Sequence, residues 1–169
     1  MGLFNFPMIT RIQRNHGLEH ATIHILSRRN GHLSLVGHSD WNGFTLYGPV
    51  DTSEVKYSAQ EALRRLRQGE AELAVHPRCG TVLATTGFLT GLAAFMAISL
   101  DTNSRGRFRW ASIPAAILAA TLAAIIAQPL GLLLQERYTT TGHPGNLGIK
   151  SVSVNPAGNL ITHRVETAQ

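Results

Sequence analysis

Two histidines four residues apart, with a glutamate between them, are the residues of this sequence best suited to do chemistry. They stand in the segment His16-Gly17-Leu18-Glu19-His20, which has the pattern His-x-x-Glu-His. On a helix, residues four apart lie on one face, so both imidazoles can be directed at the same point. Two imidazoles with an adjacent carboxylate suit a zinc ion with a general base beside it, and this order is the inverted zincin motif. We therefore expect His16 and His20 to bind Zn²⁺ and Glu19 to be the catalytic base.

A helix from about Pro7 to about Asn30 would position this motif. Proline is tolerated in the first turn of a helix, and Asn30-Gly31 is a good stop signal. Apolar residues between these points recur at three- and four-residue steps, as on one face of a helix. The alternative is that both histidines are ordinary residues of an amphipathic helix. Because a charged group among apolar contacts is costly without a metal, the stripe favours the metal-binding interpretation.

A second pair of candidate ligands, His76 and Cys79, directly precedes a long apolar segment. Pro77 can occupy the first position of a helix, so we expect a helix to begin there, with His76 as its cap and Cys79 in its first turn. A histidine and a cysteine three residues apart on a helix can share a metal site. The alternative is an inert, packed cysteine and an interfacial histidine. We expect at least one of the two to bind the metal, and Cys79 is favoured because a thiolate offsets the charge of the ion.

Two long apolar segments, residues 81–100 and 110–134, contain no Asp, Glu, Lys or Arg. Each has the ~20 residues that a helix needs to cross a bilayer. We therefore expect a transmembrane hairpin in an integral membrane protein, with the lipid bilayer as its first partner. More Lys and Arg residues flank the outer ends of this hairpin than stand in its short loop, so the positive-inside rule predicts both termini on the cytoplasmic side of a bacterial inner membrane.

The polar segments predict one more helix and two hairpins. Residues 32–50 alternate around a long, turn-like connection, His38–Gly43, and therefore indicate a first β-hairpin. Asp51 and Glu54 form a capping-box pattern at the start of a second helix. Residues 150–165 contain two short alternating runs around the turn sequence Asn-Pro-Ala-Gly-Asn, which indicates a second hairpin.

The predicted fold class is therefore α+β, with N-terminal helices, a small antiparallel sheet formed by the two hairpins, and a two-helix transmembrane hairpin. We expect three regions, namely an N-terminal metal-motif region, a transmembrane hairpin and a C-terminal tail with a β-hairpin, at residues 1–80, 81–135 and 136–169.

Charge and composition exclude several function classes. The net charge of +5 comes from basic residues scattered as pairs such as Arg28-Arg29 and Arg64-Arg65, and not from a basic stripe interleaved with aromatic residues. We therefore expect no nucleic-acid partner. The single cysteine excludes an intramolecular disulfide framework. The sequence also lacks a phosphate-binding loop, a dinucleotide fingerprint and a Gly-x-Ser-x-Gly nucleophile motif.

The two motifs together, residues 16–20 and residues 76–81, followed by apolar spans, resemble the uncharacterised bacterial membrane proteins related to YqhQ. That family carries a similar His-Gly-Ala-Glu-His motif and a similar Arg-Cys-Gly-Thr motif, although here Leu18 stands in place of alanine and only two spans are clear. The segment His-Gly-Leu-Glu-His-Ala-Thr-Ile, at residues 16–23, is closer to a smaller family of domains of unknown function. The resemblance covers about residues 12–100, and it implies a metal-type membrane protein without supplying a substrate.

Three functions fit these observations. The first is a membrane-anchored zinc hydrolase, most simply a peptidase acting on peptides or proteins, in which His16, His20 and one of His76 or Cys79 hold the ion and leave its fourth position open. In the second, all four residues bind zinc and close a structural site. The third is a non-catalytic small subunit of a membrane complex, with histidines that bind a pigment or haem. Small residues in the spans also lead us to expect a homo-oligomer or a larger membrane complex.

Overall fold

The computed structural model describes residues 7–100, 109–157 and 160–169, and the chain forms two compact units. The first unit comprises Met1–His76 and Glu136–Gln169, and the second comprises Pro77–Gln135. The two chain segments on either side of the apolar hairpin therefore fold together. Of the regions expected from the sequence, the N-terminal metal-motif region and the C-terminal tail contribute to the first unit.

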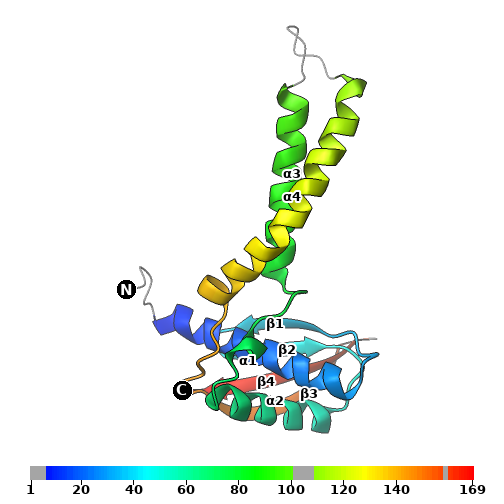
Figure 1. The fold of residues 1–169 in the computed structure, drawn as a ribbon. Helices are drawn as coiled ribbons and strands as arrows, with labels where there is room; N and C mark the ends of the chain where they lie inside the picture. Colours follow the sequence, from blue (N-terminus) through cyan, green and yellow to red (C-terminus); the bar gives the residue numbers. More distant parts are fainter. Residues whose placement is uncertain (1–6, 101–108, 158–159) are drawn as a thin grey trace. The chain divides into compact units, whose positions relative to one another are not determined.

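A four-stranded antiparallel sheet forms one layer of the first unit (Figure 1). Its strands lie in the order β1-β2-β4-β3. Both predicted hairpins are present, and they join where β2 pairs with β4, with Phe44 opposite Val165. The prediction of one small antiparallel sheet is therefore confirmed. The strands are β1 (Val36–Asp40), β2 (Gly43–Tyr47), β3 (Gly148–Ala157) and β4 (Leu160–Ala168).

The first hairpin differs from its prediction in where the turn lies. A long connection over His38–Gly43 was expected, whereas β1 extends to Asp40 and only Trp41 and Asn42 link it to β2. The Asp40 carboxylate accepts a hydrogen bond from the Asn42 backbone at 2.7 Å. Gly43 has a φ of +146°, and a Cβ there would lie 2.0 Å from the Val165 carbonyl oxygen. The polar turn residues thus occupy the end of a strand as well as the turn itself.

Two helices, α1 (Pro7–Arg29) and α2 (Thr52–Arg67), pack on the sheet and form the second layer (Figure 1). Helix α1 lies over β1 and β2, and α2 lies over β3 and β4. The bounds of α1 agree with the prediction. The predicted capping box is wrong, because the Asp51 side chain makes no capping hydrogen bond. One apolar cluster joins both helices to the sheet and includes the fully buried residues Leu18, Phe44, Leu46, Val55 and Val165.

The second unit contains two helices, α3 (Gly80–Leu100) and α4 (Ile113–Leu134), which pack against each other. By length and composition, two helical segments could cross a membrane, Gly80–Leu100 and Trp110–Thr139. The helices approach closely at Gly131, where an added Cβ would lie 2.9 Å from the Val82 Cα. The small-residue pair Gly87 and Gly91 does not make this contact, because no atom of the described chain lies within 4 Å of an added Cβ at either residue.

Helix α3 begins three residues later than the sequence predicts. Pro77 and Arg78 form a turn, and the helix starts at Gly80, so His76 is not its cap and Cys79 precedes its first turn. Proline disfavours a helical conformation of the residue before it, so His76 belongs to the extended segment that leads into this turn. Two further predictions concern residues outside the described part of the chain: the arginine-containing loop 101–108 and the tip of the second hairpin, 158–159.

Candidate metal centre

His16 and His20 lie side by side on one face of α1, as their four-residue spacing predicts. Their ring centroids are 4.4 Å apart, and one candidate ligand nitrogen of each ring lies within 4.8 Å of the other. His20 is buried, with 2 % of its surface exposed, and His16 is partly exposed. Two imidazoles on one tetrahedral zinc ion, with Zn–N bonds of ~2.0–2.1 Å, place their centroids about 5 Å apart. The two rings are therefore close enough to share a metal ion.

Backbone carbonyls fix the orientation of both rings. The His16 Nδ1 atom donates to the Thr139 carbonyl oxygen at 2.9 Å, and the His20 Nδ1 atom donates to the Ala74 carbonyl oxygen at 2.8 Å. A carbonyl oxygen can only accept, so each Nδ1 carries the proton and the lone pair of each neutral ring is on Nε2. Histidines that bind metals commonly donate their other ring N–H to a backbone carbonyl in this way.

His76 reaches the same face of α1 from a distant part of the chain. A 3₁₀ turn, Ala71–Ala74, directs the following segment along the helix. The His76 ring centroid lies 5.8 Å from that of His20 and 4.9 Å from that of His24. The His24 Nε2 atom donates to the Val75 carbonyl oxygen at 2.9 Å. Four histidines therefore form a continuous row in the first unit, in which His24 extends the His16–His20 pair by one helical turn, as its spacing predicts.

Cys79 follows His76 by three residues and belongs to the second unit. The cysteine is unoxidised and buried, and its sulfur accepts a hydrogen bond from the Thr81 backbone at 3.5 Å.

Glu19 is buried on the side of α1 that faces β1, with 3 % of its surface exposed. The Ser39 hydroxyl donates a hydrogen bond to the Glu19 Oε2 atom. A Cβ at Gly37 would lie only 2.0 Å from the Glu19 Oε1 atom, so the carboxylate fills the space that this glycine leaves. The role of Glu19 as a general base stays a prediction. Ser39 and Gly37 were not predicted to contact Glu19. They stand two residues apart in β1, and residues two apart in a strand face the same side of the sheet, which is the signal that could have identified them.

Asn15, the residue before His16, anchors this part of α1 to the sheet. Its side-chain nitrogen donates to the Asp40 carbonyl at 2.8 Å and to the Trp41 carbonyl at 3.2 Å. Its Oδ1 atom accepts a hydrogen bond from the Thr167 hydroxyl at 2.8 Å. A fully buried amide with three partners restrains the helix where the metal motif begins.

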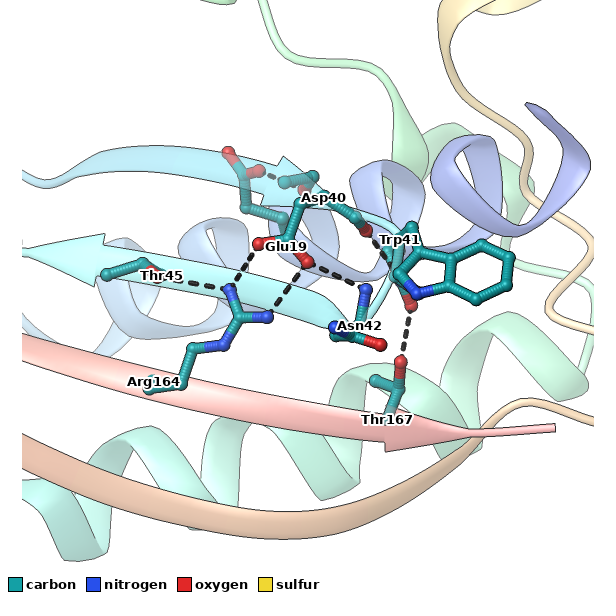
Figure 2. A network of polar contacts seen from close by, with 9 residues as sticks. Glu19, Asp40, Trp41, Asn42, Thr45, Arg164 and Thr167 are labelled. Atoms are coloured by element: carbon teal, nitrogen blue, oxygen red, sulfur yellow. Dashed lines mark hydrogen bonds and ion pairs between the residues drawn. The ribbon is translucent and has the colours of Figure 1, made fainter. Parts of the chain in front are cut away.

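The outer face of the sheet carries an ion pair between Asp40 and Arg164 (Figure 2). Both nitrogens of the guanidinium donate to the carboxylate, each at 2.8 Å, and one also lies 3.3 Å from the Thr45 hydroxyl. The Arg164 hydrogen bond lowers the pKa of Asp40 below its ordinary value. Successive residues of a strand face opposite sides of the sheet. Because Ser39 faces α1, its neighbours Asp40 and His38 point away from α1 and from the histidine row.

A cavity of about 290 Å³ adjoins the backbone segments that hold the histidine rings. Ala74 and Val75 form one side of it, and residues 140–143 form another. Its polar side chains include Glu72, Glu136 and His143. The volume lies near the lower end of that of small-molecule sites. A larger cavity, of about 460 Å³, lies between α2 and the start of β3 and is lined by Arg64 and Arg67 among others.

Comparison with known proteins places most of the chain in a single family. The family model described as "Domain of unknown function (DUF6391)" matches residues 11–152. An uncharacterized protein of the cyanobacterium Picosynechococcus sp. is 34 % identical over 154 residues, which cover 85 % of this chain and 72 % of that protein. No solved structure matches. The expectation of an uncharacterised bacterial family is confirmed, whereas these matches do not support the resemblance to YqhQ-like proteins.

Proposed function

Because the chain belongs to the DUF6391 family, whose description states no activity, its function must be inferred from the site, and we propose that it is a membrane-anchored zinc-binding protein. In this proposal His16 and His20 hold Zn²⁺ through their Nε2 atoms. The two apolar helices of the second unit provide the anchor.

The observation that carries this proposal is the pair of hydrogen bonds from His16 Nδ1 to Thr139 and from His20 Nδ1 to Ala74. Each bond leaves the lone pair of its ring on Nε2, the atom that a metal ion would bind. Here two separate backbone segments select the same tautomer in two adjacent rings, and the rings have the spacing of a shared ion. This arrangement raises the basicity of both Nε2 atoms toward a cation.

A third ligand would come from the segment that contains His76 and Cys79. His76 already lies against His20, and Cys79 follows His76 by three residues. With one ligand from this segment, the ion keeps an open position, as in catalytic zinc sites, where the metal lowers the pKa of water to ~7. Glu19 would then accept a proton from the attacking water after releasing the Ser39 hydroxyl, which holds its carboxylate against β1, and the adjoining cavity would receive a short segment of peptide. We therefore favour a peptidase-like hydrolase.

A structural zinc site is the second candidate, and the position of His76 supports it. If both His76 and Cys79 bind together with His16 and His20, four protein ligands close the tetrahedron. Glu19 would then stabilise the fold through Ser39 and take no part in chemistry. In that case the protein would serve as a non-catalytic subunit of a membrane complex.

The change Glu19→Gln separates these candidates. Full-length protein purified in detergent is assayed for zinc content and for hydrolysis of a library of short peptides, with Glu54→Gln on α2 as the control. If the protein is a hydrolase, Glu19→Gln should lose activity, because an amide cannot accept the proton. The same variant should retain zinc. Equal hydrolysis by the wild type and Glu19→Gln would contradict the catalytic role. Stoichiometric zinc without hydrolysis in the wild type would favour the structural site.

A further inference from the structure

The row of four histidines is too long for one metal ion. His16 and His24 are eight residues apart on α1, which corresponds to about 12 Å along the helix axis. Side chains on one face of a helix are tilted in the same direction, so the two rings keep roughly this separation and do not share an ion, whose ligand atoms lie within ~2.1 Å of it. His20 and His76 occupy the middle of the row, and His24 lies at the end opposite His16.

The geometry points to a second divalent-metal position, formed by His24 and His76, next to that of His16 and His20. This inference rests on the zinc site proposed above and adds a new ligand and a second ion to it. The His24 and His76 centroids are 4.9 Å apart, close to the ~5 Å expected of two imidazoles on one tetrahedral ion.

Hydrogen bonding defines which atom of His24 would bind. Its Nε2 atom donates to the Val75 carbonyl at 2.9 Å, so the lone pair of the neutral ring is on Nδ1. The neighbouring Ala74 carbonyl orients His20. The carbonyls of Ala74, the last residue of the 3₁₀ turn, and of Val75 thus orient His20 and His24, and the same stretch of chain supplies His76. The second position therefore has the same kind of outer support as the first.

The two positions differ in burial. His20 is buried, whereas His24 and His76 are both partly exposed. The outer ion has the imidazoles of His24 and His76 and completes its coordination with water. Greater exposure makes the outer ion the weaker and faster-exchanging of the two. The outer position would therefore load the inner one or hold a second, exchangeable ion.

Calorimetric titration of metal-free, full-length protein in detergent with Zn²⁺ tests this inference. We expect two binding phases in the wild type and loss of only the weaker phase in His24→Gln. The glutamine amide can still donate to the Val75 carbonyl but has no counterpart of the Nδ1 lone pair, so the fold is preserved while the ligand is removed. His76→Gln should also remove the weaker phase. The control is His32→Ala, an exposed histidine that follows α1 and lies outside the row.

The outcomes distinguish the second position from the first. A single phase in the wild type that His24→Gln leaves unchanged, and that His16→Ala removes, would overturn the inference and leave the proposed zinc site intact. Two phases that both persist in His24→Gln would also overturn it. Absence of any zinc binding by the wild type would contradict both the inference and the proposed function. Circular dichroism of each variant excludes misfolding as the cause of a lost phase.

Discussion

His76 lies against His20, with their ring centroids 5.8 Å apart, although the two residues belong to distant segments of the chain. The segment before His76 is held by the buried residues Leu73 and Ala74, and the Ala74 carbonyl accepts the His20 Nδ1 proton. The same contact that orients a predicted ligand thus brings a second predicted ligand close to it. The candidate metal centre of the first unit therefore lies where helix α1 meets this extended segment.

Gly17 permits the close approach of backbone segments to the metal motif. A Cβ at this position would lie 2.2 Å from the Thr141 carbonyl oxygen and 3.2 Å from the Ala74 Cβ atom. We predict that Gly17→Ala lowers the free energy of unfolding by about 1–3 kcal/mol, because a backbone atom must move to relieve the contact. Zinc affinity should fall as well, since the displaced segments carry the carbonyls that orient His16 and His20.

Thermal unfolding and zinc titration in detergent measure both effects, and Gly31→Ala is a suitable control. Gly31 follows α1, and no atom of the described chain lies within 4 Å of an added Cβ there. Equal stability and zinc affinity of Gly17→Ala and Gly31→Ala would show that these segments do not approach α1 as closely as described.

Gly37 and Glu19 provide a paired test of where the carboxylate lies. Gly37→Ala should destabilise the protein, because the new methyl group would displace the buried Glu19 carboxylate from its hydrogen bond with Ser39. The same change in a Glu19→Ala background should cost less, since the clashing atoms are gone. A double-mutant cycle from unfolding measurements gives the coupling, which we expect at about 0.5–3 kcal/mol. Additive effects would mean that Glu19 does not face β1.

His163 makes the stability of the first unit sensitive to acid. It is buried beside the start of α2, where its Nδ1 atom lies 3.3 Å from the Thr52 hydroxyl, and within the described chain its Nε2 atom has no hydrogen-bond partner. Burial lowers the pKa of His163 below its ordinary value of 6.5. The unfolded chain therefore takes up a proton more readily than the folded one, so stability should fall as the pH drops below about 6.5.

The substitution His163→Phe removes this titrating group and the unpartnered nitrogen. We expect the variant to lose less stability between pH 7 and pH 5 than the wild type, as measured by chemical unfolding at each pH. An unchanged pH dependence would assign the acid sensitivity to other groups.

Local sequence patterns were sufficient for the extent of α1 and for the position of His16 beside His20. The apolar stripe of α1, bounded by Pro7 and Asn30, depends on a short-range period that the fold preserves. The strands were less predictable, because the alternation around Leu33 and Leu35 resembled a strand while β1 begins at Val36. Residue types that favour turns occur both at the end of β1 and in the turn itself. The sequence pattern therefore could not define which residues of β1 and β2 pair.

Long-range contacts account for what the sequence could not reveal. Nothing in the spacing of His24 and His76 shows that a 3₁₀ turn brings them together. The Ser39 partner of Glu19 likewise depends on β1 crossing α1. Pro77 suggested a helix start by its type alone, whereas the chain uses it in the turn before α3. Proline is compatible with both positions, and only the packing around them decides between the two.

The most direct test of the zinc site is the metal content of the full-length protein and of its His16→Ala and His20→Ala variants. Each is purified in detergent, washed with a mild chelator to remove loosely bound metal, and analysed by elemental mass spectrometry and zinc X-ray absorption. The wild type should retain one zinc ion per chain with imidazole nitrogen at ~2.0–2.1 Å, while both variants lose it and the His32→Ala control does not. Stoichiometric zinc with an unchanged absorption spectrum in either variant would contradict the site.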